Sequence, residues 1–166
     1  RAYGVFTYDY SIRTFAYFIQ PKIFSKGKEI SELTETIDIT PTILSALEIP
    51  EKTSCLKIQG KDLLEYINNS NNSVKSNSVQ NELSGRFAFS ETGGVEGPWP
   101  SPKEPNVKCV RNFKWKLIHN LTPGNWELYD LEKDPNENEN LVDSFPDIVK
   151  KLKLKMGDIE KSCDES

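Results

Sequence analysis

Short segments in which apolar and polar residues alternate dominate the second half of the chain. Four segments show this pattern, each with its apolar side chains on one face: 86–91, 107–111, 114–119 and 126–131. Alternation of this kind is typical of strands that bury one face of a sheet. The last connection, residues 120–125, contains Pro123 and Gly124 and has the composition of a hairpin loop. The pattern therefore predicts an antiparallel meander of about four strands.

The chain then changes to helical spacing. The apolar residues of this stretch fall on one helical face: Phe145, Ile148, Val149, Leu152 and Met156. Ser144 has the spacing of a capping box with Asp147, and Gly157 is a stop signal, so we predict a helix that ends at Gly157. Most lysines of the stretch lie on the other face. That basic face is either an ordinary solvated surface or a binding surface for an anionic partner.

The first part of the chain predicts one strand and one helix. Residues 15–19 form an apolar run closed by Pro21, which is typical of a buried strand in a parallel sheet. Such a strand needs helices on both faces, and few are available in this sequence. We therefore expect a large part of the fold to precede Arg1. Residues 39–47 have an apolar helical face, with Thr40 as the expected N-cap.

A polar tract separates these two parts of the chain. Residues 68–81 are rich in asparagine and serine, and Val74 and Val79 are their only aliphatic residues. Such a tract cannot bury enough apolar surface to offset the entropy lost on ordering it. We therefore expect a mobile linker over residues 68–84.

Composition and charge exclude several classes of protein. The 166 residues are 36% hydrophobic and 28% charged, with a net charge of -4 at pH 7. This argues against a general nucleic-acid binder, which needs a basic face. No apolar run approaches the roughly 20 residues that span a bilayer. Cys55, Cys109 and Cys163 form no Cys-x-x-Cys pair, so neither a zinc site nor a dithiol motif is predicted. The start of the sequence indicates no cellular compartment.

Residues 126–141 carry the most specific motif. They contain L-Y-D-L-x-x-D-P-x-E-x-x-N-L, which resembles the signature near the C-terminus of sulfatases, members of the alkaline-phosphatase superfamily. Three further segments resemble sulfatase motifs in the expected order: Tyr8 to Arg13 (Y-E-x-x-I-R-V-P), Asp38 to Leu44 (D-[IL]-x-P-T-[IL]-L) and Ile58 to Leu64 (I-x-G-x-S-L-L). The chain therefore resembles the last third or so of a sulfatase over nearly its whole length.

The resemblance implies an alkaline-phosphatase-like α/β fold, of which this chain is the C-terminal portion. Residues 1–67 are expected to end the catalytic domain, with part of a mixed central sheet. Residues 68–84 are the linker, and residues 85–166 form a small α+β subdomain with a four-stranded antiparallel sheet and a C-terminal helix. The implied reaction is hydrolysis of sulfate esters of small molecules or carbohydrates. Two alternatives remain: hydrolysis of phosphodiesters or phosphonate esters, and a non-catalytic binding or packing module.

Family chemistry uses the motif C/S-x-P-x-R, whose Cys or Ser matures to formylglycine, and a divalent cation, Ca²⁺ by resemblance. The sequence contains neither that motif nor an Asp-Asp pair or an Asp-His-Gly string. We therefore predict no catalytic or metal-ligating residue in this segment and expect the nucleophile and the Ca²⁺ ligands upstream of Arg1. Many sulfatases also have a sulfate-binding lysine at the position of Gly4. The remainder of the catalytic domain is then a required partner.

The loop of residues 92–105 is the best candidate for substrate contact. It is rich in glycine and proline and is longer than an ordinary hairpin loop. Loops of this kind are natural rims of an active-site cleft, so Trp99 is a candidate contact for a sugar and Lys103 for an anionic group. The alternative is an exposed loop without substrate contact.

Three other residues invite a chemical role but favour a structural one. Arg13, beside an apolar run, is expected to be a buried ion-pair partner rather than a substrate ligand. Asp38 stands just before a helix, where a carboxylate favours capping. His119 is the only histidine, and its place on an alternating strand favours a surface or packing role.

Overall fold

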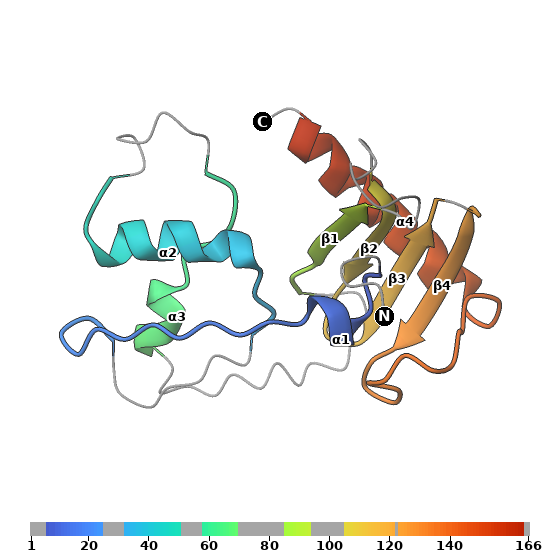
Figure 1. The fold of residues 1–166 in the computed structure, drawn as a ribbon, viewed down its shortest axis with the longest axis horizontal. Coiled ribbons are helices and arrows are strands. Elements are labelled where there is room, and N and C mark those ends of the chain that lie inside the picture. The colour runs from blue at the N-terminus through green and yellow to red at the C-terminus, as the bar shows by residue number, and fades with distance from the viewer. Residues whose placement is uncertain are drawn as a thin grey trace. The chain divides into compact units, whose positions relative to one another are not determined.

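The computed structural model describes six parts of the chain: residues 6–24, 32–50, 58–69, 85–93, 105–121 and 123–164. These residues belong to two compact units (Figure 1). Residues 6–14 and 85–164 form the first unit, and the described residues between 15 and 69 form the second. The linker predicted at residues 68–84 lies almost wholly outside the described residues. The predicted domain boundaries stay a prediction.

A single antiparallel sheet forms the centre of the first unit. Its strands are β1 (Ala88–Gly93), β2 (Pro105–Arg111), β3 (Trp115–Asn120) and β4 (Asn125–Asp130), and they lie in the order β1-β2-β3-β4 (Figure 1). The register places Val110 opposite Leu117 and Leu117 opposite Leu128. Side chains of such cross-strand neighbours point to the same face. The predicted four-stranded meander is confirmed.

Helix α4 (Pro146–Asp164) crosses one face of this sheet (Figure 1). The core between helix and sheet contains these buried side chains: Val110, Trp115, Leu117, Leu128, Val149, Leu152 and Met156. Leu117, Leu128 and Leu152 have no exposed surface. Because strand side chains alternate between faces, the core residues of β3 and β4 are two positions apart, and Val110 of β2 lies on the same face.

The opposite face of the sheet is covered from the N-terminal end of the chain. A second set of buried side chains lies there: Val107, Cys109, Ile118 and Tyr129. Tyr8 and Ile12 pack against this set from the short helix α1 (Asp9–Ile12) and the residue before it. The sheet therefore has apolar contacts on both faces, and residues separated by more than 100 positions in the sequence form the second layer.

The second unit contains a 3-10 turn, η1 (Thr36–Asp38), and two short helices, α2 (Ile39–Ala46) and α3 (Leu64–Asn69). Helix α2 begins before the expected N-cap Thr40, with Asp38 in the N-cap position. The buried Asp38 carboxylate accepts the Glu35 N–H at 2.8 Å and the Lys61 N–H at 2.7 Å. Its predicted structural role is confirmed, because it holds the loop before α3 against the start of α2.

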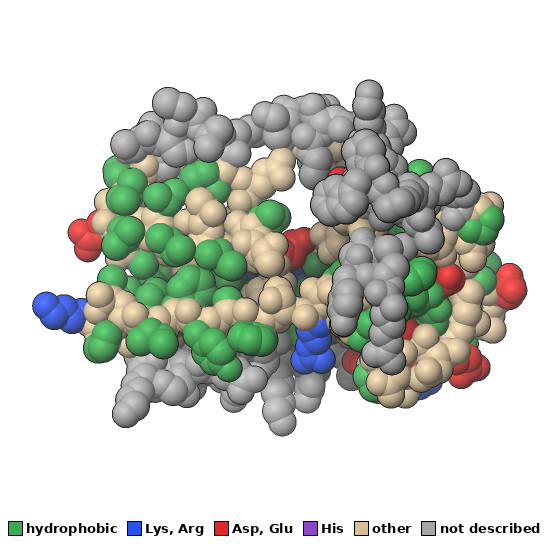
Figure 2. All heavy atoms as spheres, in the orientation of Figure 1, with side chains coloured by type: hydrophobic (Ala, Val, Ile, Leu, Met, Phe, Trp, Pro, Cys, Tyr) green, Lys and Arg blue, Asp and Glu red, His purple; other side chains and the backbone are tan. Residues whose placement is uncertain are grey.

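Residues 15–19 form neither a helix nor a strand, so the strand predicted there is absent among the described residues. Phe15 and Tyr17 are 82% exposed and Ile19 is 88% exposed. Figure 2 shows hydrophobic side chains gathered on the surface of this unit. A strand needs hydrogen-bonding neighbours, and no described segment pairs with these residues.

Helix α4 continues through Gly157 to Asp164, so the predicted end of the helix at Gly157 is wrong. Glycine weakens a helix interior by about 1 kcal/mol relative to alanine. Here Met156 is buried and Ile159 packs against the same core, so burial on both sides of the glycine continues the helix. Tertiary packing outweighs local propensity at this position.

We predict that Gly157→Ala stabilises the protein by about 0.5–1 kcal/mol, because a Cβ at this position meets nothing within 4 Å. Urea unfolding measures the change. Gly60→Ala is the matched control and is expected to destabilise. Gly60 has a φ of +101°, and a Cβ there would lie 2.3 Å from the Ile37 carbonyl oxygen. Equal effects of the two substitutions would contradict this account.

Candidate functional site

A buried ionic cluster holds the N-terminal segment against the sheet of the first unit. At its centre is Lys116 of β3, whose side chain has no exposed surface. The Lys116 Nζ lies 2.8 Å from Asp9 Oδ1 and 2.7 Å from Glu137 Oε1. A fully buried ammonium needs opposite charges at this distance, because desolvation would otherwise favour the neutral amine. Lys116 therefore requires both carboxylates.

Arg111 of β2 completes the cluster. It is the cross-strand partner of Lys116, and two like charges in that arrangement repel each other. The Asp9 carboxylate relieves the repulsion by binding both cations, with Asp9 Oδ2 2.5 Å from Arg111 Nη1. The cluster thus contains two cations and two carboxylates, the second of which is Glu137. Their formal charges balance.

Glu137 reaches the cluster from the turn that follows β4. The residue is buried and has a φ of 55°, a left-handed conformation that costs a non-glycine residue roughly 1 kcal/mol. Besides its ion pair, Glu137 accepts the Asp9 N–H at 2.6 Å through Oε2. The turn itself is held by Asp134, which accepts the N–H groups of Asn138 and Glu139 at 2.6 and 2.8 Å. The ionic contacts offset the backbone strain.

A second polar group lies on the same face of the sheet. The Glu127 carboxylate accepts the hydroxyls of Tyr8 and Tyr129 and the Asn120 side-chain amide, each at 2.8 Å. Burial, with the adjacent Glu127 carboxylate, raises the pKa of Tyr8 to about 12 and raises the pKa of Tyr129 as well. Both phenols therefore stay protonated and donate. The N-terminal segment is attached to the sheet at Tyr8 and at Asp9.

The pKa of Asp9 reflects two opposing effects. Burial alone raises the pKa of this carboxyl, but the hydrogen bond and charge of Lys116, together with the charge of Arg111, outweigh it. The pKa of Asp9 consequently lies below its ordinary value. The carboxylate remains ionised at neutral pH and is a stable member of the cluster.

These groups are engaged with one another and do not form a metal centre. Among the described residues, no group of three or more His, Cys, Asp or Glu side chains has the arrangement of a cation site. Asp9, which is partly buried, and Glu137, which is buried, already bind Lys116. The residues present therefore do not fit the divalent cation that the sulfatase resemblance implies.

His119 and Cys109 also have structural roles. The His119 ring stacks on Trp126 of β4 with centroids 3.7 Å apart, and the Nζ of Lys153, which belongs to α4, lies 4.0 Å from the Trp126 ring. Burial and the nearby Lys153 charge lower the pKa of His119. Cys109 is 1% exposed, and burial raises the pKa of its thiol, so the thiolate is disfavoured. The packing role expected for His119 is confirmed.

The structure locates some of the predicted site residues and not others. Trp99 and Lys103 lie outside the described residues, so their substrate contacts stay a prediction. Arg13 is exposed and forms no ion pair with any described residue, so the expectation of a buried ion pair is wrong. Asp9, four positions before Arg13 in the same motif, forms the partly buried ion pairs instead. None of the helices in the described ranges is long and apolar enough to cross a bilayer.

The ionic cluster was not predicted from the sequence, although two signals point to it. Lys116 interrupts an apolar run between Trp115 and Leu117, which places it on the face opposite the α4 core. Asp9 and Glu137 are the acidic positions of the first and last sulfatase-like motifs. Only the strand register, which pairs Arg111 with Lys116, shows that these four side chains meet.

The comparison with protein families identifies the chain. The model of the N-sulphoglucosamine sulphohydrolase C-terminal family matches residues 4–162. The chain therefore belongs to this sulfatase family, as its motifs suggested. It is also 29% identical over 142 residues to an uncharacterized sulfatase of Schizosaccharomyces pombe, a match that covers 81% of this chain and 21% of that protein.

Solved structures show the same fold. The chain is similar to BT4656, which was solved in complex with its substrate D-glucosamine-2-N,6-O-disulfate, with a TM-score of 0.65, 21% identity, and coverage of 88% of this chain and 28% of BT4656. It is also similar to BT1596, a 2-O GAG sulfatase, with a TM-score of 0.53, 24% identity, and coverage of 77% and 25%. The predicted sulfatase-like fold is confirmed. The chain spans about a quarter of the length of these relatives.

We predict that Lys116→Met destabilises the protein by about 3–5 kcal/mol, because it leaves the buried Glu137 and the partly buried Asp9 without their shared cation. Urea unfolding followed by tryptophan fluorescence measures the change. Lys133→Met is the control: this lysine is 83% exposed and lies 4.0 Å from Asp130, so the expected change is within about 0.5 kcal/mol. Similar losses of stability in Lys116→Met and Lys133→Met would mean that the ionic cluster makes no specific contribution to stability.

The lowered pKa of Asp9 predicts an acid-dependent loss of stability. A carboxyl whose pKa is lower in the folded state stabilises the protein above its unfolded pKa, near 3.8, and loses this contribution as the pH falls through the folded value. Stability between about pH 4 and pH 2 should therefore fall more steeply in the unmodified protein than in Asp9→Asn. Urea midpoints across this range test it, with the exposed Asp143→Asn as the control for one lost charge. Parallel curves for all three proteins would contradict the prediction.

Proposed function

We propose that this chain is the C-terminal part of a sulfatase that hydrolyses sulfate esters of sugars. In this proposal the nucleophile, expected to be formylglycine, and the Ca²⁺ ligands belong to residues that precede Arg1. The observation that carries it is family membership over residues 4–162, combined with a length of about a quarter of the related sulfatases. The chain then supplies a structural part of the enzyme and the rim of its active site.

The chemistry of the described residues supports the proposal that the nucleophile and the Ca²⁺ ligands lie in another part of the enzyme. Cleavage of a sulfate ester needs a positioned nucleophile and cations that neutralise the developing charge. Lys116 and Arg111 are the two cations of the ionic cluster. Asp9 and Glu137 already neutralise their charges. These groups hold the N-terminal segment in place, and their charges are already balanced within the cluster rather than available to neutralise a sulfate ester.

The exposed apolar side chains of residues 15–19 give further support. Phe15, Tyr17 and Ile19 alternate along the chain and are each more than 80% exposed. An unpaired apolar segment of this kind is suited to pairing with a neighbouring strand. We propose that the remainder of the catalytic domain supplies that strand, as the sequence pattern predicted.

The names of the relatives indicate the class of substrate. The matching family is named for N-sulphoglucosamine, and BT4656 binds D-glucosamine-2-N,6-O-disulfate. We therefore propose a sulfated amino sugar, bound in part by the loop that carries Trp99 and Lys103. An indole ring can pack on the apolar face of a sugar, and an ammonium can bind its sulfate.

Assays of the full-length protein test the proposal. With Ca²⁺ present, it should release sulfate from N- or O-sulfated glucosamine faster than it hydrolyses a phosphodiester or phosphonate ester, and residues 1–166 alone should release none. Faster phosphoester hydrolysis would favour the rival activity, and absence of both activities would favour a non-catalytic module. Sulfate release by residues 1–166 alone would contradict the proposal that the nucleophile and the Ca²⁺ ligands belong to residues that precede Arg1.

We predict that Lys103→Ala raises the KM for the sulfated sugar about tenfold, which corresponds to about 1.4 kcal/mol, with a smaller effect on kcat. Steady-state kinetics of the full-length variant measure this. Lys22→Ala, which removes an exposed lysine of the second unit, is the matched control. An unchanged KM in Lys103→Ala would show that the loop does not contact the substrate.

A further inference from the structure

The solvent side of α4 carries an unusual concentration of positive charge. It contains four exposed lysines: Lys150, Lys151, Lys153 and Lys155. No acidic residue occurs between positions 148 and 157, although the chain as a whole has a net charge of -4. At a rise of 1.5 Å per residue the four lysines span about 7.5 Å along the helix, which is within one Debye length at physiological salt. Lys150 and Lys153 lie one turn apart on one side of the helix, whereas Lys151 and Lys155 lie on the other side. Lys150 and Lys153 are here named the lysine face.

These lysines have no carboxylate partners within the described part of the chain. Lys153 Nζ lies 4.0 Å from the Trp126 ring, and Lys155 Nζ lies 5.6 Å from the Phe87 ring. By contrast, Lys108 of β2 forms a 2.7 Å ion pair with Glu160 of the same helix. Neighbouring ammonium groups repel each other, so an external anion would be attracted to the lysine face.

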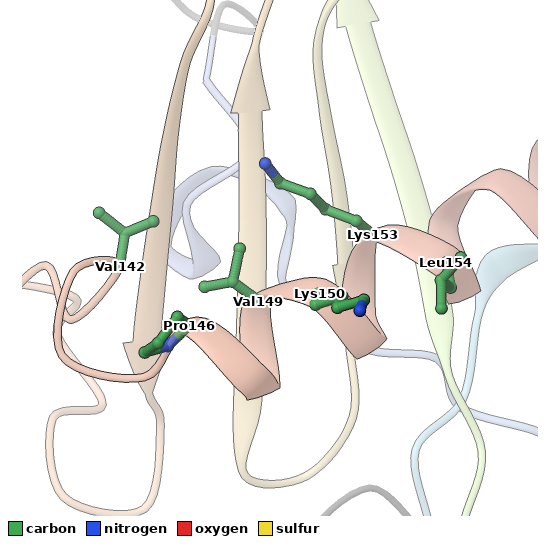
Figure 3. Close-up of a pocket in the computed structure, with 6 residues that line it drawn as sticks. All are labelled: Val142, Pro146, Val149, Lys150, Lys153 and Leu154. Carbon is green, nitrogen blue, oxygen red and sulfur yellow. The ribbon is translucent and has the colours of Figure 1, made fainter.

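A shallow groove lies along the lysine face. Its lining consists of six residues: Val142, Pro146, Val149, Lys150, Lys153 and Leu154. Figure 3 shows five of these side chains along α4 and Val142 on the segment before it, with Lys153 extending from the helix toward the strands. The groove has a volume of about 470 Å³, and Leu154, on its edge, is 64% exposed. It thus combines an apolar floor with two ammonium groups.

We propose that the lysine face binds a sulfated polysaccharide chain. The ammonium groups of Lys150 and Lys153 would contact sulfate groups, and the apolar floor would contact the C–H face of a sugar ring. This proposal rests on the proposed function, because it concerns the polymer from which a sulfated sugar substrate is taken. The surface would keep the enzyme on that polymer between successive reactions by raising the local substrate concentration.

Charge and shape favour a sulfated polysaccharide over a nucleic acid. A duplex carries one charge per 1.7 Å and is bound by wide basic surfaces. The lysine face is short and belongs to an acidic chain. Single strands are bound by free aromatic faces, whereas Trp126 beside this groove is stacked between His119 and Lys153.

Binding of the full-length protein to an immobilised, highly sulfated polysaccharide tests the proposal. We expect Lys150→Gln combined with Lys153→Gln to weaken binding about tenfold or more and to reduce its salt dependence. The charge-retaining pair K150R/K153R should bind as the unmodified protein does. The control pair K22Q/K133Q removes two exposed lysines elsewhere and should change affinity less than twofold.

Four further comparisons distinguish the possible outcomes. Weak binding of the desulfated polymer, and retained binding when a sulfated monosaccharide saturates the enzyme, support the proposal. Equal loss in K150Q/K153Q and K22Q/K133Q, or binding of duplex DNA as tight as that of the polysaccharide, overturns it. Turnover of the sulfated monosaccharide should be unchanged in K150Q/K153Q. Polymer binding without any sulfate release would refute the proposed function while leaving the lysine face as a binding surface.

Discussion

The complete burial of one ammonium group determines much of the arrangement of the first unit. Lys116 has no exposed surface and so depends on the carboxylates of Asp9 and Glu137. One of these comes from the N-terminal end of the chain and the other from the turn after β4. The requirement of a single strand residue therefore fixes a segment and a turn on the same face of the sheet. Hydrophobic burial by Tyr8 and Ile12 then adds to this attachment.

The sulfatase signature after β4 is a structural motif in which separate residues have separate tasks. Asp134 accepts the N–H groups that close the turn, and Glu137 enters the ionic cluster. The Asn140 side chain accepts the Leu128 N–H at 3.0 Å, while Leu141 packs on the α4 core. The acidic character of the motif thus serves the backbone and the cluster. Its residues identify the family, and these contacts of the motif are structural.

Local sequence patterns predicted the strands and helix α4, because the apolar face of each follows from the spacing of its own residues. The strands were predictable because one face of the sheet is apolar and packs against α4, although its other face is also largely covered. The apolar face of α4 follows from its own spacing. Features that depend on distant residues were not predictable in this way. Helix α4 passes Gly157 because of its packing on the sheet, and the ionic cluster depends on the register of Arg111 and Lys116. The exposed run at residues 15–19 shows the opposite case, in which a pattern typical of burial finds no cover among the described residues.

The hydrogen bond between Asp9 and Glu137 joins residues 128 positions apart, which has a consequence for the order of folding. Contacts of such long sequence separation form late, because the intervening chain must first be ordered. During synthesis, Asp9 leaves the ribosome on the order of ten seconds before Glu137 at ordinary elongation rates. Throughout that interval the N-terminal segment has no sheet to cover, and its aromatic side chains are open to chaperones and to aggregation. The part of the chain that contains Glu137 therefore determines when the segment around Asp9 is covered.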